Sequence, residues 1–145
     1  MPAITVRVRN MGRLQAKVKQ ADLESQANTI IALRGLTAPI EQDIKSELSR
    51  PKSGEVVTRY RPERRVKVSL PGEPPAKDLG MLVNSVEVDV DPVQFNLTLS
   101  ASAHYARHLE YGTRRMLPRP FLRPALTRWR ARIIEAIHSA IKRSF

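Results

Sequence analysis

The chain contains no cysteine, few aromatic residues and no long apolar run. Without cysteine it can form neither disulfide bonds nor thiolate-based sites. Aromatic residues make up 5% of the 145 residues, so the core must be mainly aliphatic. No segment approaches the roughly 20 consecutive apolar residues of a membrane span, and we expect no membrane partner. This length predicts one domain, residues 1–145, with a modest core.

Positive charge is what the chain has in excess. Its formal net charge is +11, and the basic residues concentrate in two segments. Residues 50–67 contain seven basic and two acidic residues, and residues 107–145 contain ten basic and two acidic residues. Such segments favour a polyanion or an acidic protein surface as a neighbour. A basic surface that only keeps the protein soluble is the alternative.

Hydrophobic periodicity predicts mainly helix over residues 11–48, after a short strand near residues 4–8. Residues spaced for one face of a helix include Ile40, Ile44 and Leu48. Thr37-Ala38-Pro39 predicts a new helix start, because proline suits the first turn of a helix. The pattern leaves open whether Gly35 separates two helices or lies inside one long helix.

Residues 50–75 form a segment rich in proline and arginine, which we call the arm. Two β-prone stretches, residues 56–60 and 66–70, flank the basic stretch 61–65. The arm is therefore predicted to be either an extended hairpin with a basic tip or a loop that becomes ordered only on meeting a partner. The arginines expected to contact a neighbouring subunit or partner are Arg59, Arg61, Arg64 and Arg65.

The clearest pattern predicts a β-hairpin over residues 82–100. Its apolar residues at every second position are Val86, Val88, Val90, Val93, Phe95, Leu97 and Leu99. Glu87 and Asp89 alternate with the valines, and Asp91-Pro92 marks the turn. Period-two patterning on both sides of a turn indicates an antiparallel pair with one buried face.

The last predicted element is an amphipathic helix over residues 120–143. Its apolar stripe, which contains Leu122, Trp129 and Ile133, is expected to pack on the apolar face of the hairpin. Arginines expected to face outward, toward DNA or an acidic protein surface, are Arg128, Arg130 and Arg132. The predicted fold is α+β, with N-terminal helices, a small antiparallel sheet carrying an extended basic loop or hairpin, and a C-terminal helix packed on the sheet.

Residues that could support catalysis or metal binding do not form a recognisable motif. His104 and His108 have the i, i+4 spacing of two metal ligands, with Glu110 nearby, but Arg107 between them would repel a cation. Glu87 and Asp89 share a strand face, which is typical of a solvated surface. We therefore expect no catalytic, cofactor or metal site, and we do not expect an enzyme.

The segment from residue 105 to residue 111 fits a short helix, with Gly112 just past its end. Tyr105 and Leu109 lie one helical step apart and are expected to anchor this helix on the sheet. Glu110 is expected to project outward, near Arg114 and Arg115. Two contacts are open: a Glu–Arg pair between neighbouring subunits, or a local Glu110–Arg114 pair worth little free energy.

The approach to the last helix contains three prolines, Pro118, Pro120 and Pro124. Their fixed φ angles stiffen this connection and direct the helix that follows. Phe121, one of only three phenylalanines, is expected to fill the core at this elbow. We call residues 105–125 the joint.

Three segments in this order carry a resemblance to a known family: residues 69–85, residues 105–113 and residues 118–125. Together they resemble the head–tail joining, or tail-completion, proteins from the neck of long-tailed bacteriophages, which are often described as tail components. The Glu-aromatic-Gly-Thr and Pro-Arg-Pro-Phe-x-x-Pro-Ala patterns are the most specific. One departure is Leu70, which stands where a small residue is more usual.

The resemblance implies a structural virion protein that forms a ring, expected to be a hexamer. The ring would join the tail tube to the connector of the DNA-filled head. Its partners would be other copies of the chain, the connector or head-completion protein, the tail tube or tail terminator proteins, and DNA passing through the channel. The protein would assemble in the host cytoplasm and remain in the neck of the virion. The alternative is a sequence-nonspecific DNA-binding protein that uses the two basic segments.

Overall fold

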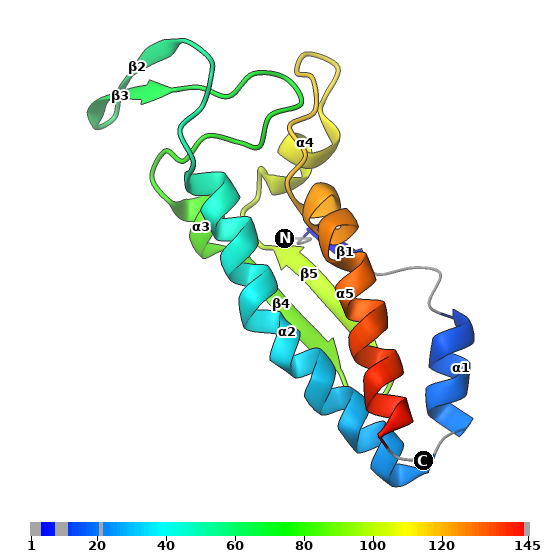
Figure 1. Ribbon diagram of the computed structural model, residues 1–145. Helices are drawn as coiled ribbons and strands as arrows, with labels where there is room; N and C mark the ends of the chain where they lie inside the picture. The colour runs from blue at the N-terminus through cyan, green and yellow to red at the C-terminus, as the bar shows by residue number, and fades with distance from the viewer. Residues whose placement is uncertain (1–3, 8–11, 21, 144–145) are drawn as a thin grey trace.

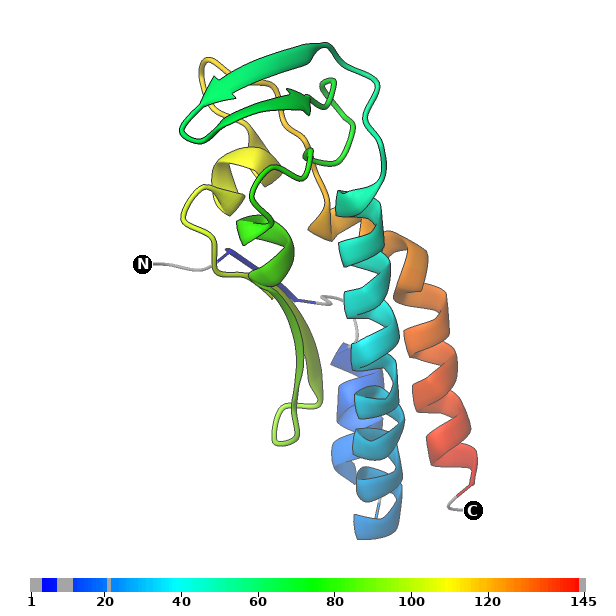
Figure 2. The same ribbon diagram turned by 90° about the vertical axis from the view of Figure 1, so that its left-hand side faces the viewer.

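The computed structural model describes residues 4–7, 12–20 and 22–143, and its fold is α+β. In chain order the elements are β1 (Ile4–Arg7), α1 (Gly12–Gln20), α2 (Leu23–Ser49), β2 (Val56–Tyr60), β3 (Glu63–Lys67), α3 (Met81–Asn84), β4 (Val86–Asp91), β5 (Asn96–Ala101), α4 (Ala106–Tyr111) and α5 (Leu122–Lys142). Helices α2 and α5 run side by side along one face of a small sheet (Figures 1 and 2).

The sheet has three antiparallel strands in the order β1-β5-β4. The predicted hairpin is confirmed as β4 and β5, with Val88 opposite Leu99 and Val90 opposite Leu97. Along β4 the valines are buried and the acidic residues are exposed, as the alternation predicts. The predicted N-terminal strand is confirmed as β1, which adds to the far edge of β5.

The turn between β4 and β5 differs from the prediction. Val93, expected on the apolar face, is 72% exposed because it lies in the turn. The Asp91 carboxylate accepts hydrogen bonds from the backbone N–H groups of Val93 (2.8 Å) and Gln94 (3.0 Å) and so fixes the reversal of the chain. Phe95 then takes a positive φ of 53° and is buried.

Helix α2 is one continuous helix, so the predicted helix start at residues 37–39 is wrong. The helix begins after Asp22, whose carboxylate accepts the N–H of Ser25 at 2.8 Å. Gly35 and Pro39 both lie inside it. Burial of one apolar stripe along the whole helix outweighs the cost of an internal proline, about 3 kcal/mol. The fully buried side chains of this stripe include Leu33, Ile40, Ile44 and Leu48.

Helix α5 forms as predicted, packing along α2 and reaching the sheet at β5. The core between these layers is mainly aliphatic, as the low aromatic content requires. Its fully buried members outside α2 include Leu97, Leu99, Leu122 and Ile133. Within residues 4–7, 12–20 and 22–143, no helix is long and apolar enough to span a membrane.

The arm is a two-stranded hairpin, which confirms one of its two predicted forms. It projects from the end of the molecule where α2 ends (Figures 1 and 2). Tyr60 pairs with Glu63, so the second strand starts earlier than predicted. Arg64 and Arg65 therefore belong to β3, and Arg61-Pro62 forms the tip.

Candidate functional site: the joint and the arm

The joint brings together the three segments that carry the family resemblance. The backbone N–H of Arg119 donates to the Leu109 carbonyl at 2.7 Å, which ties the proline-rich stretch to α4. The N–H of Gly72 donates to the Pro118 carbonyl at 3.0 Å, and Nε of Arg119 donates to the Ser69 carbonyl at 3.1 Å. Segments up to 50 residues apart in sequence thus form one hydrogen-bonded unit.

Glu110 lies at the centre of the joint and is fully buried. Its Oε2 accepts the N–H groups of Phe121 (2.8 Å) and Leu122 (3.1 Å), and its Oε1 accepts the N–H of Arg123 (3.0 Å). These donors open α5, where backbone N–H groups have no partner within the helix. The carboxylate therefore caps α5 from a different helix, and its negative charge suits the helix N-terminus.

Arg123 compensates the buried charge of Glu110. Its Nε donates to Oε1 of Glu110 at 3.1 Å, and its terminal nitrogen donates to the Glu110 carbonyl at 2.9 Å. The guanidinium carbon also lies 4.9 Å from the centre of the Tyr111 ring. A buried carboxylate is tolerated when its charge is paired and its oxygen atoms are hydrogen-bonded, and both conditions are met here.

The prediction that Glu110 projects outward is therefore wrong, and its arginine partner within the chain is Arg123 and not Arg114. Arg114 and Arg115 are exposed in the loop that follows Gly112, and Thr113 N–H closes that loop on the Met116 carbonyl at 2.8 Å. One sequence signal pointed to the observed role. Helix α5 starts at Phe121-Leu122 without a capping side chain of its own, so an acceptor from elsewhere was needed.

Gly112 ends α4 with a φ of 75°, as predicted from its position. A Cβ atom there would lie 2.8 Å from the Met116 carbonyl oxygen and 3.0 Å from the Pro118 nitrogen. Phe121 is 3% exposed, which confirms its place in the core. Tyr105 and Leu109 are half-buried and pack against the core, as expected for anchors of α4. Of the three prolines in the joint, Pro118 is exposed, and Pro120 and Pro124 are half-buried.

Asp78 holds the arm against the rest of the molecule. Its Oδ2 accepts a hydrogen bond from a terminal nitrogen of Arg64 at 2.7 Å, and Nε of Arg59 lies 3.4 Å from the same oxygen. The hydrogen bond from Arg64 lowers the pKa of Asp78; burial opposes this effect, and the charges of Arg64 and Arg59 add to it, so that the pKa is lowered overall. We call Asp78, Arg59 and Arg64 the latch.

The latch changes the interpretation of the arm's arginines. Arg59 and Arg64, expected to face a partner, are turned toward Asp78 of their own chain. Arg61 and Arg65 are exposed, as expected. Nothing in the sequence indicates that Asp78 meets the arm.

A second contact fixes the base of the arm. Glu73 accepts hydrogen bonds from the Ser53 hydroxyl (2.8 Å), the Ser53 N–H (3.2 Å) and the Leu70 N–H (2.9 Å). The Leu70 and Ser53 hydrogen bonds lower the pKa of Glu73. The two ends of the arm are also joined by the Gly54 N–H, which donates to the Val68 carbonyl at 3.1 Å. The base is therefore held by the Glu73 carboxylate and by a backbone hydrogen bond, whereas the strands above it contact the rest of the molecule through the latch.

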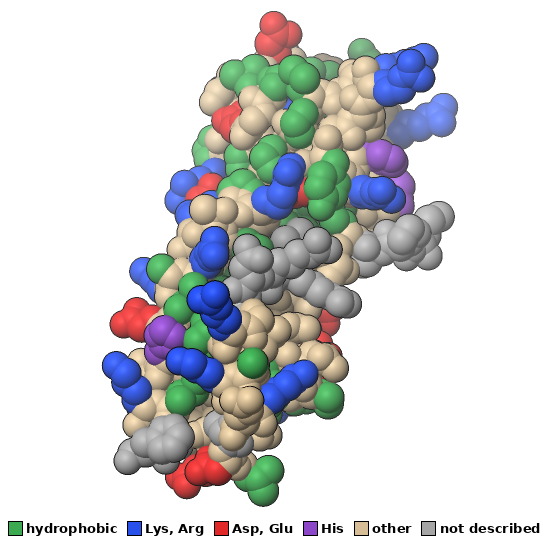
Figure 3. Space-filling model, turned by 90° about the vertical axis from the view of Figure 1, so that its right-hand side faces the viewer, with side chains coloured by type: hydrophobic (Ala, Val, Ile, Leu, Met, Phe, Trp, Pro, Cys, Tyr) green, Lys and Arg blue, Asp and Glu red, His purple; other side chains and the backbone are tan. Residues whose placement is uncertain are grey.

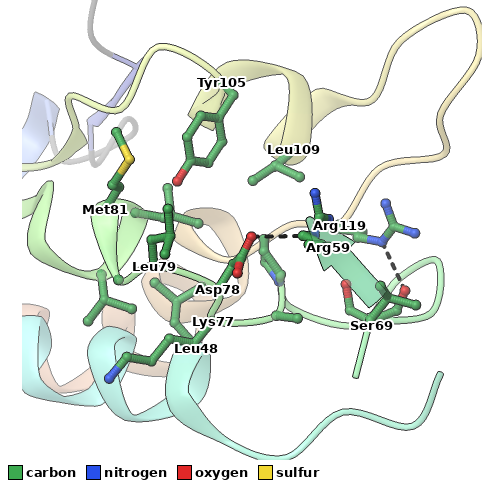
Figure 4. A pocket seen from close by; sticks show the side chains of 16 residues that line it. Leu48, Arg59, Ser69, Lys77, Asp78, Leu79, Met81, Tyr105, Leu109 and Arg119 are labelled. Atoms are coloured by element: carbon green, nitrogen blue, oxygen red, sulfur yellow. Dashed lines mark hydrogen bonds and ion pairs between the residues drawn. The ribbon is translucent and has the colours of Figure 1, made fainter. Parts of the chain in front are cut away.

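A cavity of about 510 Å³ lies between the arm, residues 75–83 and α4. Figure 4 shows Tyr105 and Leu109 on one side of it and the Arg59–Asp78 contact across it. Burial raises the pKa of Tyr105, and this effect is larger than the opposing effect of a hydrogen bond with the Leu82 backbone. The arm thus meets the rest of the molecule over a cavity and through polar side chains.

Metal-binding geometry is not found in the described part of the chain. Across residues 4–7, 12–20 and 22–143 no three His, Asp or Glu side chains are grouped to hold a metal ion. His104 and His108 are exposed, while Glu110 is buried and turned toward α5.

The arginines of α5 have different environments. Arg128 donates to Oδ2 of Asp43 at 2.7 Å, and Nε1 of Trp129 donates to the same oxygen at 3.0 Å. The pKa of Asp43 is lowered: burial alone would raise it, but these two hydrogen bonds and nearby positive charges outweigh burial. Arg132 lies over the Trp129 ring, 4.9 Å from its centre. Arg130 is exposed.

Arg128 therefore joins α5 to α2 within the chain. Among the described residues, Arg132 contacts the Trp129 ring and Arg130 has no side-chain partner. Figure 3 shows lysine and arginine side chains scattered over one face of the molecule rather than gathered in a single patch. No family model matches the chain, and no curated protein or solved structure is significantly similar to it.

Proposed function

We propose that the chain is a structural subunit of a tailed-bacteriophage neck. Copies of it form a ring, expected to be a hexamer, that joins the tail tube to the connector of the DNA-filled head. In this role the protein binds other virion proteins and carries out no catalysis. It is present in the host cytoplasm during assembly and in the neck of the finished virion.

One observation carries this proposal. The three segments on which the family resemblance rests, residues 69–85, 105–113 and 118–125, meet in the joint through the Arg119, Gly72 and Glu110 hydrogen bonds. Their residue pattern therefore has one common structural purpose: it fixes how α5 leaves α4. A rigid body with a projecting, charged hairpin suits a protein whose task is to contact neighbours in an assembly.

The exposed arginines support a second candidate, a sequence-nonspecific DNA-binding protein. Those that are exposed and lie outside the intrachain pairs described above include Arg61, Arg65, Arg114, Arg115 and Arg130. Binding through several phosphate contacts should weaken steeply as salt concentration rises. The scattered distribution of basic side chains on the face seen in Figure 3 favours the neck assignment, because phosphate binding along a duplex calls for a continuous basic stripe.

The test is electron microscopy of lysates from the phage or induced prophage that carries the gene, with the gene disrupted. We expect separate DNA-filled heads and free tails of normal length, and intact virions when the wild-type gene is supplied from a plasmid. Normal virions from the disrupted phage would contradict a role in the virion. Empty heads or tails of abnormal length would contradict a joining role.

The DNA-binding candidate has its own test with purified protein and a short DNA duplex. Filter binding or fluorescence anisotropy at low and high salt would show a steep loss of affinity if phosphates are contacted. Absence of binding at low salt would exclude this candidate.

A further inference from the structure

Among the strands of this chain that have an unpaired edge, two carry opposite charges. The first is β4, which is one of the two edge strands of the three-stranded sheet. Its outward-facing side chains include Glu87 and Asp89, and both are exposed. Neither has an ion-pair partner among the described residues. Strand β4 therefore presents a free backbone edge and an unmatched row of negative charge.

The second strand is β3 in the arm, which has β2 on one side only. Arg65 and Lys67 are two positions apart and both are exposed. They lie on the opposite face of the hairpin from Arg64, which points to Asp78 in the latch. Their charges have no partner among the described residues. Strand β3 therefore presents a free edge whose exposed face carries Arg65 and Lys67, with Glu63 at its start, and is net positive.

The two edges are apart within one molecule. Figures 1 and 2 place the arm at the end of the molecule beyond α3, whereas β4 runs away from that end. A contact between them must therefore involve two copies of the chain. Parallel, in-register pairing of two arms with each other is unfavourable, because it would place the like charges of two β3 strands side by side.

We propose that β3 of one copy pairs along the β4 edge of a neighbouring copy, so that the sheet continues from one subunit into the next. Backbone hydrogen bonds between the strands would supply affinity. Arg65 and Lys67 facing Glu87 and Asp89, with opposing Cβ atoms about 5 Å apart, would supply specificity. The occupant of the β4 edge is thus the arm of a second copy.

This contact explains two features of the fold. A two-stranded hairpin is marginally stable alone, and the arm lies over a cavity instead of a packed core. Pairing of β3 with the β4 edge of another copy would make the hairpin part of a larger sheet. The contact is also heterologous, since different surfaces of the two copies meet, and repeated heterologous contacts close into rings or extend into open chains. The inference rests on the proposed self-association and names the surfaces that make it.

The test reverses charge on each side separately and measures assembly of the full chain by light scattering and sedimentation velocity. One variant is Arg65→Glu with Lys67→Glu, and the other is Glu87→Lys with Asp89→Lys. Wild-type protein is expected to form a closed oligomer. Each variant alone places like charges opposite each other, and its contact should be at least about tenfold weaker.

An equal mixture of the two variants gives the decisive result. The acidic arm of one variant matches the basic β4 edge of the other, and the unchanged arm and edge also match. The mixture should therefore recover the wild-type oligomer from two species that do not assemble alone. A matched control, Arg13→Glu with Arg34→Glu, changes net charge by the same amount on exposed positions of α1 and α2 and should assemble as wild type.

Three results would overturn the contact: a wild-type chain that stays monomeric, variants that assemble normally, or a mixture that fails to recover the oligomer. The last two would leave the neck proposal standing, since electron microscopy of the disrupted phage tests that proposal independently. Thermal unfolding by circular dichroism verifies that each variant is folded. If the edge charges served only to prevent unwanted strand pairing, neither variant would lose assembly.

Discussion

The joint and the arm use the same chemical pair in opposite ways. In the joint, the carboxylate of Glu110 is fully buried and is bound by three backbone N–H groups as well as by Arg123. At the latch, the carboxylate of Asp78 is exposed and is bound by the side chains of Arg64 and Arg59 of the arm. Each is a carboxylate–arginine contact between segments distant in sequence.

The two contacts should differ in their contribution to stability, because only the Glu110 carboxylate is buried and bound by backbone N–H groups. Removal of the Glu110 carboxylate would leave buried N–H groups without a partner, and such groups are costly. Removal of the Asp78 carboxylate would leave arginines that water can solvate, and exposed ion pairs contribute little stability. We infer that the joint fixes the geometry of α4 and α5, while the latch holds the arm in a position from which it can be released.

Replacement of Glu110 should have the largest effect. Glu110→Ala is expected to lower the free energy of unfolding by about 3 kcal/mol, because the first turn of α5 loses its cap and Arg123 loses its partner. Urea denaturation followed by circular dichroism measures this change. Glu110→Gln retains one acceptor oxygen and should cost less, about 1 kcal/mol. Equal, small losses in both variants would show that the buried carboxylate does not hold the joint.

Gly112→Ala should have the next largest effect, about 2 kcal/mol, since the added Cβ meets backbone atoms and the φ is positive. Thermal unfolding measures it. Gly35→Ala in α2 is the matched control: its Cβ would meet nothing within 4 Å, and the helix should gain up to about 1 kcal/mol. A similar result for both glycines would contradict the proposed tight geometry of the joint.

Acid should weaken the exposed contacts of Asp43 and Asp78. Both have pKa values lowered in the folded chain. Such groups stabilise the fold above their unfolded pKa, and this contribution is lost as pH falls through the lower, folded pKa. Between about pH 5 and pH 3, the melting temperature of the wild type should fall a few degrees more than that of Asp43→Asn with Asp78→Asn. If the melting temperatures of the two proteins fall equally with pH, the carboxylates of Asp43 and Asp78 do not supply this stability.

Asp78→Asn should change global stability least and arm mobility most. We expect a melting temperature close to that of the wild type but faster tryptic cleavage after Arg64 and Arg65, because the arm opens more often without the latch. Glu135→Gln removes an exposed carboxylate of α5, outside both the latch and the β4 edge, and serves as the control. If both variants are cleaved at the wild-type rate, the latch does not restrain the arm.

The sequence by itself determined the elements whose pattern is local. The alternation over residues 86–100 predicted β4 and β5, because burial of one sheet face requires apolar residues at every second position. The stripe over residues 120–143 predicted α5, since a helix packed on one side needs a period of 3.6. Gly112 was also predicted, because few residues other than glycine adopt its backbone conformation.

Tertiary structure alone decided the contacts between distant segments. Whether Glu110 faces solvent or caps α5 depends on the path of the loop between them, and no periodicity encodes that path. The meeting of Asp78 with the arm depends in the same way on how residues 75–80 cross the end of α2. The continuity of α2 through Pro39 was likewise settled by packing against the sheet and α5, which outweighs the local preference for a break. Local patterns specify which face of an element is buried, whereas the partner of that face, or of a single charge, is fixed only when the whole chain packs.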